Sequence, residues 1–176
     1  MQGCAKNVFL TFDDGPIPEV TEWVLEELKK HNAKETFFCV GSNILSNQNI
    51  FEKVIKDGHG IGNHTMHHVK GSEVDSEIYF EEVKECEIFT KTKLFRPPYG
   101  RMKKKQYKSL TSESFKIIMW DVISYDYENI PENKVLENAI ENTQNGSIVL
   151  FHDSLKAEKK DRKSTRLNSS HRCISY

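Results

Sequence analysis

Short apolar runs alternate along this chain with longer stretches in which apolar residues recur every three or four positions. The short runs are rich in β-branched and aromatic residues, which predicts strands, at residues 7–12, 36–40, 59–63, 93–96, 115–121 and 147–152. The longer stretches have the period of an amphipathic helix, at residues 19–30, 50–56, 76–90, 102–110 and 133–142. Strands that alternate with helices in this way predict a parallel sheet covered by helices.

Ionisable residues lie at or just past the carboxyl ends of five of the six expected strands. They are Asp13 with Asp14, His64, Arg96, Asp121 and His152. An open parallel sheet would spread these strand ends over about 25 Å, at roughly 5 Å per strand. A closed or nearly closed barrel would bring them to one pocket. We therefore expect an α/β fold of the (β/α) barrel kind, with a functional site at the carboxyl ends of its strands.

The composition is typical of one globular domain. The chain has 176 residues, of which 37% are hydrophobic and 29% charged, enough for one core and too short for two comfortable domains. No apolar run approaches about 18 residues, so we expect no membrane span. The first ten residues lack the pattern of a signal peptide, and location in a bacterial cytoplasm or in the cell envelope stays open.

Residues 161–176 break the pattern. Their sequence, DRKSTRLNSSHRCISY, has neither helical nor strand periodicity, and Asp161 to His171 match the in-frame translation of a sequencing-library adapter. A basic natural tail is the alternative. We expect one domain over residues 1–160 and a non-native, disordered tail over residues 161–176.

Charge and cysteine usage argue against two classes of function. The net charge is −1, and it is −4 without the tail, which carries four of the 25 basic and one of the 26 acidic residues. With one dense basic run, Lys103 to Lys105, the chain has no footprint for nucleic acid. Outside the tail, Cys4, Cys39 and Cys86 lack paired spacing, so they predict neither a disulfide framework nor a zinc knuckle.

Two histidines and a carboxylate pair have the chemistry of a metal site. His64 and His68 are four residues apart, so they would share one face of a helix and could hold a single ion. Together with one carboxylate of Asp13 and Asp14 they make a set with open positions, suited to zinc or a similar divalent ion. Taken alone, the histidines could belong to an exposed polar loop, and the acidic pair to a turn.

The remaining groups indicate hydrolysis. The second carboxylate is free to act as a base on a bound water, and His152 could donate a proton to a leaving group. Metal, base and separate acid are together what the hydrolysis of an amide or ester needs. A cofactor enzyme of the Rossmann type is disfavoured, because no G-x-G-x-x-G follows the first strand.

Five motifs of this sequence resemble those of the polysaccharide deacetylases, the NodB-homology domains of carbohydrate esterase family 4. They are Thr11-Phe12-Asp13-Asp14-Gly15-Pro16, His64-Thr65-x-x-His68, Arg96-Pro97-Pro98-Tyr99-Gly100, Trp120-Asp121 to Asp126-Tyr127, and Leu150-Phe151-His152-Asp153. They occur in order, and the resemblance runs from about residue 7 to residue 157. It implies a distorted (β/α) barrel of the NodB type, incomplete at the C-terminus.

The resemblance implies a metal site and a base. Asp14, His64 and His68 would hold the metal, with zinc expected first and cobalt or another divalent ion as alternatives. Asp13 would take the proton of the water. Arg96 would keep Asp13 ionised, because a neighbouring guanidinium favours the charged form of a carboxylate.

The resemblance also implies the other half of the site. The backbone N–H of Tyr99 would face the oxyanion that develops on the acyl oxygen. His152 would protonate the departing amine, and Asp126 would keep it charged and oriented. Trp120 and Leu150 would wall a small acetyl pocket.

The implied activity is removal of N-acetyl groups from a polysaccharide that contains N-acetylglucosamine, such as peptidoglycan or a chitin-like glycan, with release of acetate. We expect a monomer whose partner is the acetylated glycan. The alternatives are an O-acetyl esterase on xylan-like glycans, which would use the same machinery, and an inactive sugar-binding fragment. The retention of Asp13 and His152 argues against the latter.

Three features depart from the family pattern. Glu35 stands where the family has alanine, at the start of a strand, so we expect its carboxylate to reach solvent. Tyr127 replaces a common tryptophan. The family continues past Asp153 with a helix and a strand, so we expect exposed apolar surface near Phe9 and Val149.

Overall fold

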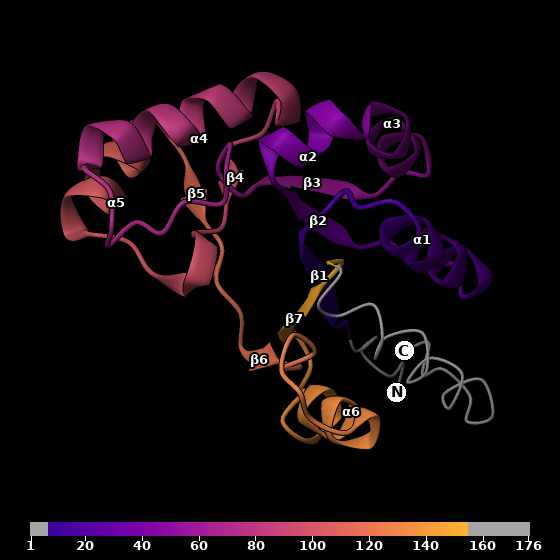
Figure 1. Cartoon of the computed structure of the whole chain (residues 1–176). Helices are drawn as coiled ribbons and strands as arrows, with labels where there is room; N and C mark the ends of the chain where they lie inside the picture. Colours follow the sequence, from indigo (N-terminus) through magenta and orange to yellow (C-terminus); the bar gives the residue numbers. More distant parts are fainter. Residues whose placement is uncertain (1–6, 155–176) are drawn as a thin grey trace, which may run out of the picture.

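The computed structural model describes residues 7–154 and contains a seven-stranded sheet (Figure 1). The strand order is β5-β4-β3-β2-β1-β7-β6, and neighbouring strands are parallel. The strands are β1 (Phe9–Asp14), β2 (Thr36–Cys39), β3 (Gly60–Asn63), β4 (Leu94–Phe95), β5 (Lys116–Ile117), β6 (Val122–Ile123) and β7 (Ile148–His152). The helices are α1 (Val20–Lys30), α2 (Gly41–Ser46), α3 (Gln48–Lys56), α4 (Ser76–Thr90), the single 3-10 turn η1 (Pro98–Gly100), α5 (Lys104–Ser112) and α6 (Glu132–Glu141).

The sheet curls into a half-barrel with helices around its outside (Figure 1). Strands β5 and β6 form its two edges. The expected distorted (β/α) barrel is therefore confirmed, and it stays open between these edges. Because parallel strands end on the same side, one rim of the half-barrel collects the side chains that follow β1, β3, β4 and β7. The boundary at residue 160 and the expected tail lie outside the described residues.

The expected strand over residues 115–121 is in fact two strands. Strand β5 pairs with β4, whereas β6 pairs with β7 at the opposite edge of the sheet. Residues 118–121 cross between the edges, and the carbonyl oxygens of Ile118 and Met119 accept hydrogen bonds from Arg96 instead of from a strand. The expectation that Asp121 joins the other strand ends is wrong, because its carboxylate accepts the Ile148 N–H at the start of β7.

Apolar side chains from the helices cover the convex side of the sheet in three clusters. One packs Phe12 and Phe37 of the sheet against Leu25 of α1 and Val54 of α3. A second lies under α4 and α5 around Phe95, and the third lies under α6. In the described part of the chain, none of these helices has the length and apolarity needed to span a bilayer.

Burial corrects two expectations about single residues and agrees with a third. Phe9 is 54% exposed, as expected, but Val149 is only 1% exposed, because it packs with Ala139 of α6. Glu35 does not reach solvent: it is 8% exposed. Burial raises the pKa of its carboxyl to about 8, although a hydrogen bond with the Leu10 backbone opposes the shift. The carboxyl is accommodated because it is neutral below that pH.

Cys39 and Cys86 are free thiols that are buried in the fold, in agreement with their interpretation as small apolar residues. Cys4 lies outside the described residues. Helix α2 was not expected from the sequence, because its segment is short, begins with glycine and carries mostly polar residues, all of which weaken a helical pattern.

Candidate metal centre and active site

Asp14, His64 and His68 converge at the rim of the half-barrel. Asp14 ends β1, and both histidines lie in the loop that follows β3. One ligand atom from each residue lies within 4.8 Å of the other two. Asp14 Oδ1 is 3.2 Å from His68 Nε2 and 3.8 Å from His64 Nε2. Two imidazole nitrogens and one carboxylate oxygen can hold a divalent cation, and they are the protein donors of one class of catalytic zinc site.

The two histidines come together through a turn. The expectation that they share one face of a helix is wrong. Thr65 and His68 both have positive φ, at 65° and 55°, so the loop bends the His68 ring back over His64, with the ring centroids 5.0 Å apart. The Asn63 side chain holds this loop: it accepts the Thr65 N–H and donates to the carbonyl oxygen of Val83 in α4.

His64 is oriented for metal binding by the backbone of the next strand end. Its Nδ1 lies 2.8 Å from the carbonyl oxygen of Arg96, and because a carbonyl oxygen only accepts, Nδ1 carries the proton and Nε2 presents a lone pair to Asp14. Burial lowers the pKa of His64, although the charges of Asp13 and Asp14 oppose this. A neutral imidazole fixed through its other nitrogen is the usual state of a metal ligand.

Asp14 has the properties of a ligand whose partner is a cation. Its Oδ1 is buried and accepts no hydrogen bond within residues 7–154, an arrangement that costs free energy unless an ion or another donor compensates. Burial is the largest influence on its pKa and would raise it. The contact with His68 and the charges of His64 and His152 outweigh burial and lower that pKa to about 2. The residues present therefore fit a divalent cation.

Asp13 and Arg96 form a buried ion pair beside this cluster. Arg96 is fully buried, and one terminal nitrogen donates to Asp13 Oδ1 at 2.7 Å and to the Thr11 hydroxyl at 2.8 Å. Its other nitrogens donate to the carbonyl oxygens of Ile118 and Met119, so the guanidinium is held on all sides. Because Arg96 occupies Asp13 Oδ1, Oδ2 is the oxygen that faces His64, at 3.8 Å.

His152 and Asp126 form a second pair on the other side of Asp13. His152 is opposite Asp13 in the pairing of β7 with β1. Its Nδ1 is 2.7 Å from Asp126 Oδ1, and its backbone N–H donates to Asp126 Oδ2, also at 2.7 Å. Burial, the largest influence, lowers the pKa of His152, but the hydrogen bond to Asp126 and the charge of that carboxylate raise it to about 9. His152 is therefore an imidazolium at neutral pH.

The remaining expected site residues surround these groups. Tyr99 has a positive φ of 59°, and its ring lies 4.9 Å from that of His68, so its side chain lies beside one histidine of the metal cluster. Trp120 packs over Gly100 so closely that a Cβ there would lie 2.6 Å from its ring. Leu150 is 2% exposed in the interior of β7, beside β1.

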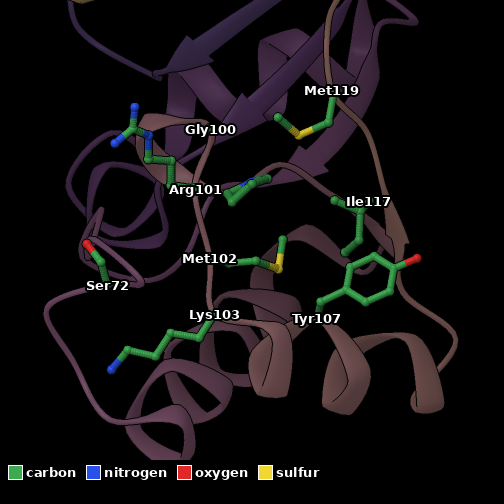
Figure 2. Close-up of a pocket in the computed structure, with 9 residues that line it drawn as sticks. Ser72, Gly100, Arg101, Met102, Lys103, Tyr107, Ile117 and Met119 are labelled. Carbon is green, nitrogen blue, oxygen red and sulfur yellow. The ribbon is translucent and has the colours of Figure 1, made fainter.

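A hollow of about 520 Å³ lies next to the loop that carries Tyr99. Figure 2 shows Met102, Ile117 and Met119 facing a common space, with Tyr107 of α5 at its edge and Arg101 pointing away. The lining of the hollow includes Pro97 and Gly100, which flank the Pro98-Tyr99 pair, together with residues of α5 and of β5 and the segment that follows it. Its size is within the range of about 300–1,000 Å³ that is typical of small-molecule sites.

Sequence reasoning missed three side chains that support this site. Thr11 shares the Arg96 guanidinium with Asp13, Asn43 of α2 donates to the Asp14 carbonyl oxygen, and Asp153 accepts the Gly15 N–H. Thr11 and Asp153 lie inside motifs that the sequence analysis quoted, but their residue types alone gave them no role. Asn43 lies in the helix that was not expected, so no sequence signal was available for it.

Comparison with known proteins gives consistent results. The polysaccharide deacetylase family matches residues 2–117. A peptidoglycan-N-acetylglucosamine deacetylase of Bacillus cereus is 37% identical over 154 residues, which are 84% of this chain and 56% of that protein. The chain thus spans little more than half the length of that relative. A chitooligosaccharide deacetylase of Azorhizobium caulinodans is 32% identical over 157 residues, 84% of this chain and 74% of that protein.

A solved structure extends the likeness to the fold. The crystal structure of a peptidoglycan N-acetylglucosamine deacetylase in complex with a naphthyl N-hydroxybenzamide superimposes with a TM-score of 0.82 at 31% identity. The match covers 93% of this chain and 82% of that chain.

Proposed function

This chain belongs to the polysaccharide deacetylase family, and on that premise we propose that it is a metal-dependent hydrolase that removes N-acetyl groups from a glycan containing N-acetylglucosamine. The observation that carries the proposal is the placement of Asp14, His64 and His68 within 4.8 Å of one another, beside a buried carboxylate, Asp13, whose neighbour on β7 is His152. A metal, a base and an acid around one point are the requirements for hydrolysis of an unactivated amide.

Asp14, His64 and His68 would hold the metal, and zinc is the ion we propose, because two histidines and a carboxylate leave a position open for water or substrate. A bound divalent cation would supply Lewis acidity, which polarises the acetyl carbonyl and lowers the pKa of a bound water. The Nδ1 contact of His64 with the Arg96 carbonyl would keep this ligand in one orientation.

Asp13 would accept the proton of the attacking water. Its Oδ1 is engaged by Arg96, which leaves Oδ2, on the side of the cluster, as the basic oxygen. Arg96 would keep this carboxylate charged and in a fixed position, and general-base catalysis of this kind is worth about a hundredfold or more in rate.

His152 would donate a proton to the departing amine. A pKa of about 9 keeps its proton available at neutral pH, and Asp126 holds the ring through Nδ1, so that Nε2 is the donating atom. Asp13 and His152 would thus act in opposite directions: the first would accept a proton, and the second, an imidazolium, would release one.

The acyl group would lie between the rim loops. We propose that the Tyr99 backbone N–H faces the developing oxyanion, and that Trp120 and Leu150 bound the methyl group of the acetyl. The hollow of Figure 2 is lined by Gly100, the residue after Tyr99, and we propose that it receives a neighbouring sugar ring of the polymer against the apolar faces of Met102 and Tyr107.

The deciding experiment measures acetate released from N-acetylated chitooligosaccharides, peptidoglycan and O-acetylated xylan, with and without zinc, cobalt and a chelator. We expect release from the first two substrates, loss with the chelator, and recovery with metal. Release from xylan alone would identify an O-acetyl esterase, and binding of all three without release would identify an inactive sugar-binding protein. Asp121→Asn is the matched control, because this carboxylate sits at the start of β7 and should leave the rate unchanged.

The domain and assembly are part of the same proposal. We propose that residues 1–160 form one catalytic domain and that the chain acts as a monomer. Light scattering of the purified chain tests the assembly, and a stable dimer would contradict it.

A further inference from the structure

Asp14 has a backbone conformation that needs support. Its φ is 88°, in the left-handed region that residues other than glycine rarely adopt, and such a residue persists only when its surroundings hold it. Rotation about the N–Cα bond of Asp14 moves its side chain and its carbonyl carbon together, so this φ sets both where the carboxylate points and where the Asp14–Gly15 peptide begins. Holding that peptide in place therefore opposes a change of φ that would move the carboxylate away from His64 and His68.

Two side chains form hydrogen bonds with this peptide unit from opposite sides. The Asn43 side-chain amide donates to the Asp14 carbonyl oxygen at 2.8 Å, and Asp153 Oδ1 accepts the Gly15 N–H at 2.9 Å. The carbonyl and the N–H of a trans peptide point in opposite directions, so the two bonds together fix its plane. Asn43 comes from α2, and Asp153 follows β7.

Asp153 is itself held firmly and is fully buried. Its Oδ2 accepts the Thr21 hydroxyl at 2.6 Å, and the Thr21 oxygen accepts the Ile17 N–H at 2.7 Å. The Asp153 backbone N–H donates to the Asp13 carbonyl oxygen. The residue thus contacts the end of β1 directly, and the turn after it both directly, at Gly15, and through Thr21.

Gly15 shows how closely the carboxylate approaches the turn. A Cβ at this position would lie 1.9 Å from Asp153 Oδ2, far inside any real contact. Only glycine leaves room for this carboxylate, so the requirement for glycine arises from Asp153 and not from the φ of Gly15 itself.

We propose that Asp153 and Asn43 are positioning residues that clamp the Asp14–Gly15 peptide and thereby hold the Asp14 carboxylate at the metal site. The inference rests on the proposed metal site. Neither residue is among the proposed metal ligands, and both act through the backbone of the turn. Because Asp153 follows His152 directly, the same clamp also sets the distance between the turn and the end of β7.

The test measures zinc affinity and thermal unfolding separately on the whole chain. In Asp153→Ala and in Asn43→Ala we expect the zinc affinity to fall about tenfold to a hundredfold, as it does when hydrogen-bond partners of metal ligands are removed. Leu110→Ala is the matched control: it opens a cavity in the core under α5, so it should lower Tm while the zinc affinity stays parental. Asp153→Asn keeps the volume and one acceptor, and its affinity should lie between those of the parent and Asp153→Ala.

Parental zinc affinity in both Asp153→Ala and Asn43→Ala, or an equal loss in Leu110→Ala, would overturn the clamp. If Asp153→Ala does not fold, Asp153→Asn and Asn43→Ala decide the matter. A parent chain that binds no zinc would overturn the metal site and the clamp together. A parent chain that binds zinc through this site but releases no acetate would overturn the proposed function alone.

Discussion

Buried ionisable groups at the two ends of the sheet have different partners. At the carboxyl end, Asp13 lies against Arg96 and His152 against Asp126, so each of these two has a partner of opposite charge. At the amino end, Glu35 is buried with a hydrogen bond from the Leu10 backbone and no ion pair within the described residues. Asp153 lies at the carboxyl end but resembles Glu35: burial raises the pKa of its carboxyl to about 8, although hydrogen bonds from Thr21 and Gly15 oppose the shift. Burial thus favours the neutral form of a carboxyl that has no cation beside it.

The same contrast exists between two histidines of one site. Both are largely buried, yet burial lowers the pKa of His64, whereas Asp126 raises the pKa of His152 to about 9. His64 Nδ1 faces a neutral carbonyl oxygen and His152 Nδ1 faces a carboxylate. One buried partner thus decides whether an imidazole is suited to bind a metal or to donate a proton.

The largest effect should come from removing the two histidines of the metal cluster. His64→Ala combined with His68→Ala should abolish stoichiometric zinc binding, because one carboxylate cannot retain the ion alone. Zinc content after dialysis measures this. His67→Ala is the matched control from the same loop, because His67 is exposed and contacts Glu82, and it should bind zinc normally. Undiminished zinc in the double variant would contradict the assignment.

Asp13→Asn tests whether Asp13 acts as the base or as a metal ligand. This variant should keep zinc and lose about a hundredfold or more in kcat, because the amide cannot accept the proton of water. Zinc titration and acetate release measure the two properties, and a thermal melt checks that Arg96, now without its ionic partner, is still accommodated. If Asp13→Asn lost zinc as completely as Asp14→Asn, the roles of the two carboxylates would have to be exchanged.

Asp126→Asn should lower the pKa of His152, so that this histidine resembles His64. Without the carboxylate, burial dominates and the pKa of His152 falls from about 9 to a value near or below its ordinary one. The alkaline limb of the rate profile should then move down by about one pH unit or more, with lower kcat at neutral pH. NMR titration of His152 provides the direct measurement. An unchanged pKa would show that Asp126 is not the cause.

Glu35→Gln should remove the free-energy cost of burying an ionised carboxylate at the amino end of the sheet. With a pKa of about 8 in the fold and 4.5 as its ordinary value, Glu35 takes up a proton on folding between these values. The Glu35 carboxyl therefore lowers the free energy of unfolding as pH rises from about 4.5 to 8, and above pH 8 this decrease is complete. At pH 8 the Gln variant should be more stable by at least about 1 kcal/mol, and at pH 4 nearly equal to the parent. Denaturant unfolding at both pH values measures this, with the exposed Glu26→Gln as the control.

The strand-end residues could be predicted because their signal is local. Asp13, Asp14, His64 and His152 each follow an apolar run, and parallel strands bring such positions together whatever the details of packing. The roles of Tyr99 and Trp120 needed the family resemblance, since neither residue type is distinctive in a loop. Both therefore remain proposals.

What the sequence did not indicate depends on long-range contacts. The run over residues 115–121 reads as one strand, but the two edges of the sheet pair with different halves of it. Asp121 was expected at the site for that reason. The support that Asn43 and Asp153 give to Asp14 joins residues far apart in the chain, which no local pattern of hydrophobicity records.

The hydrogen bonds of Arg96 connect segments that fold from distant parts of the chain. It joins β1 through Thr11 and Asp13 to the segment that crosses between the sheet edges, and Thr11 in turn donates to the carbonyl oxygen of Val149 in β7. Opening any one of these segments would leave a buried guanidinium without some of its partners, which is costly. In native-state hydrogen exchange, the amides of β1 and β7 should therefore exchange together in one cooperative opening, whereas exposed loop amides exchange independently.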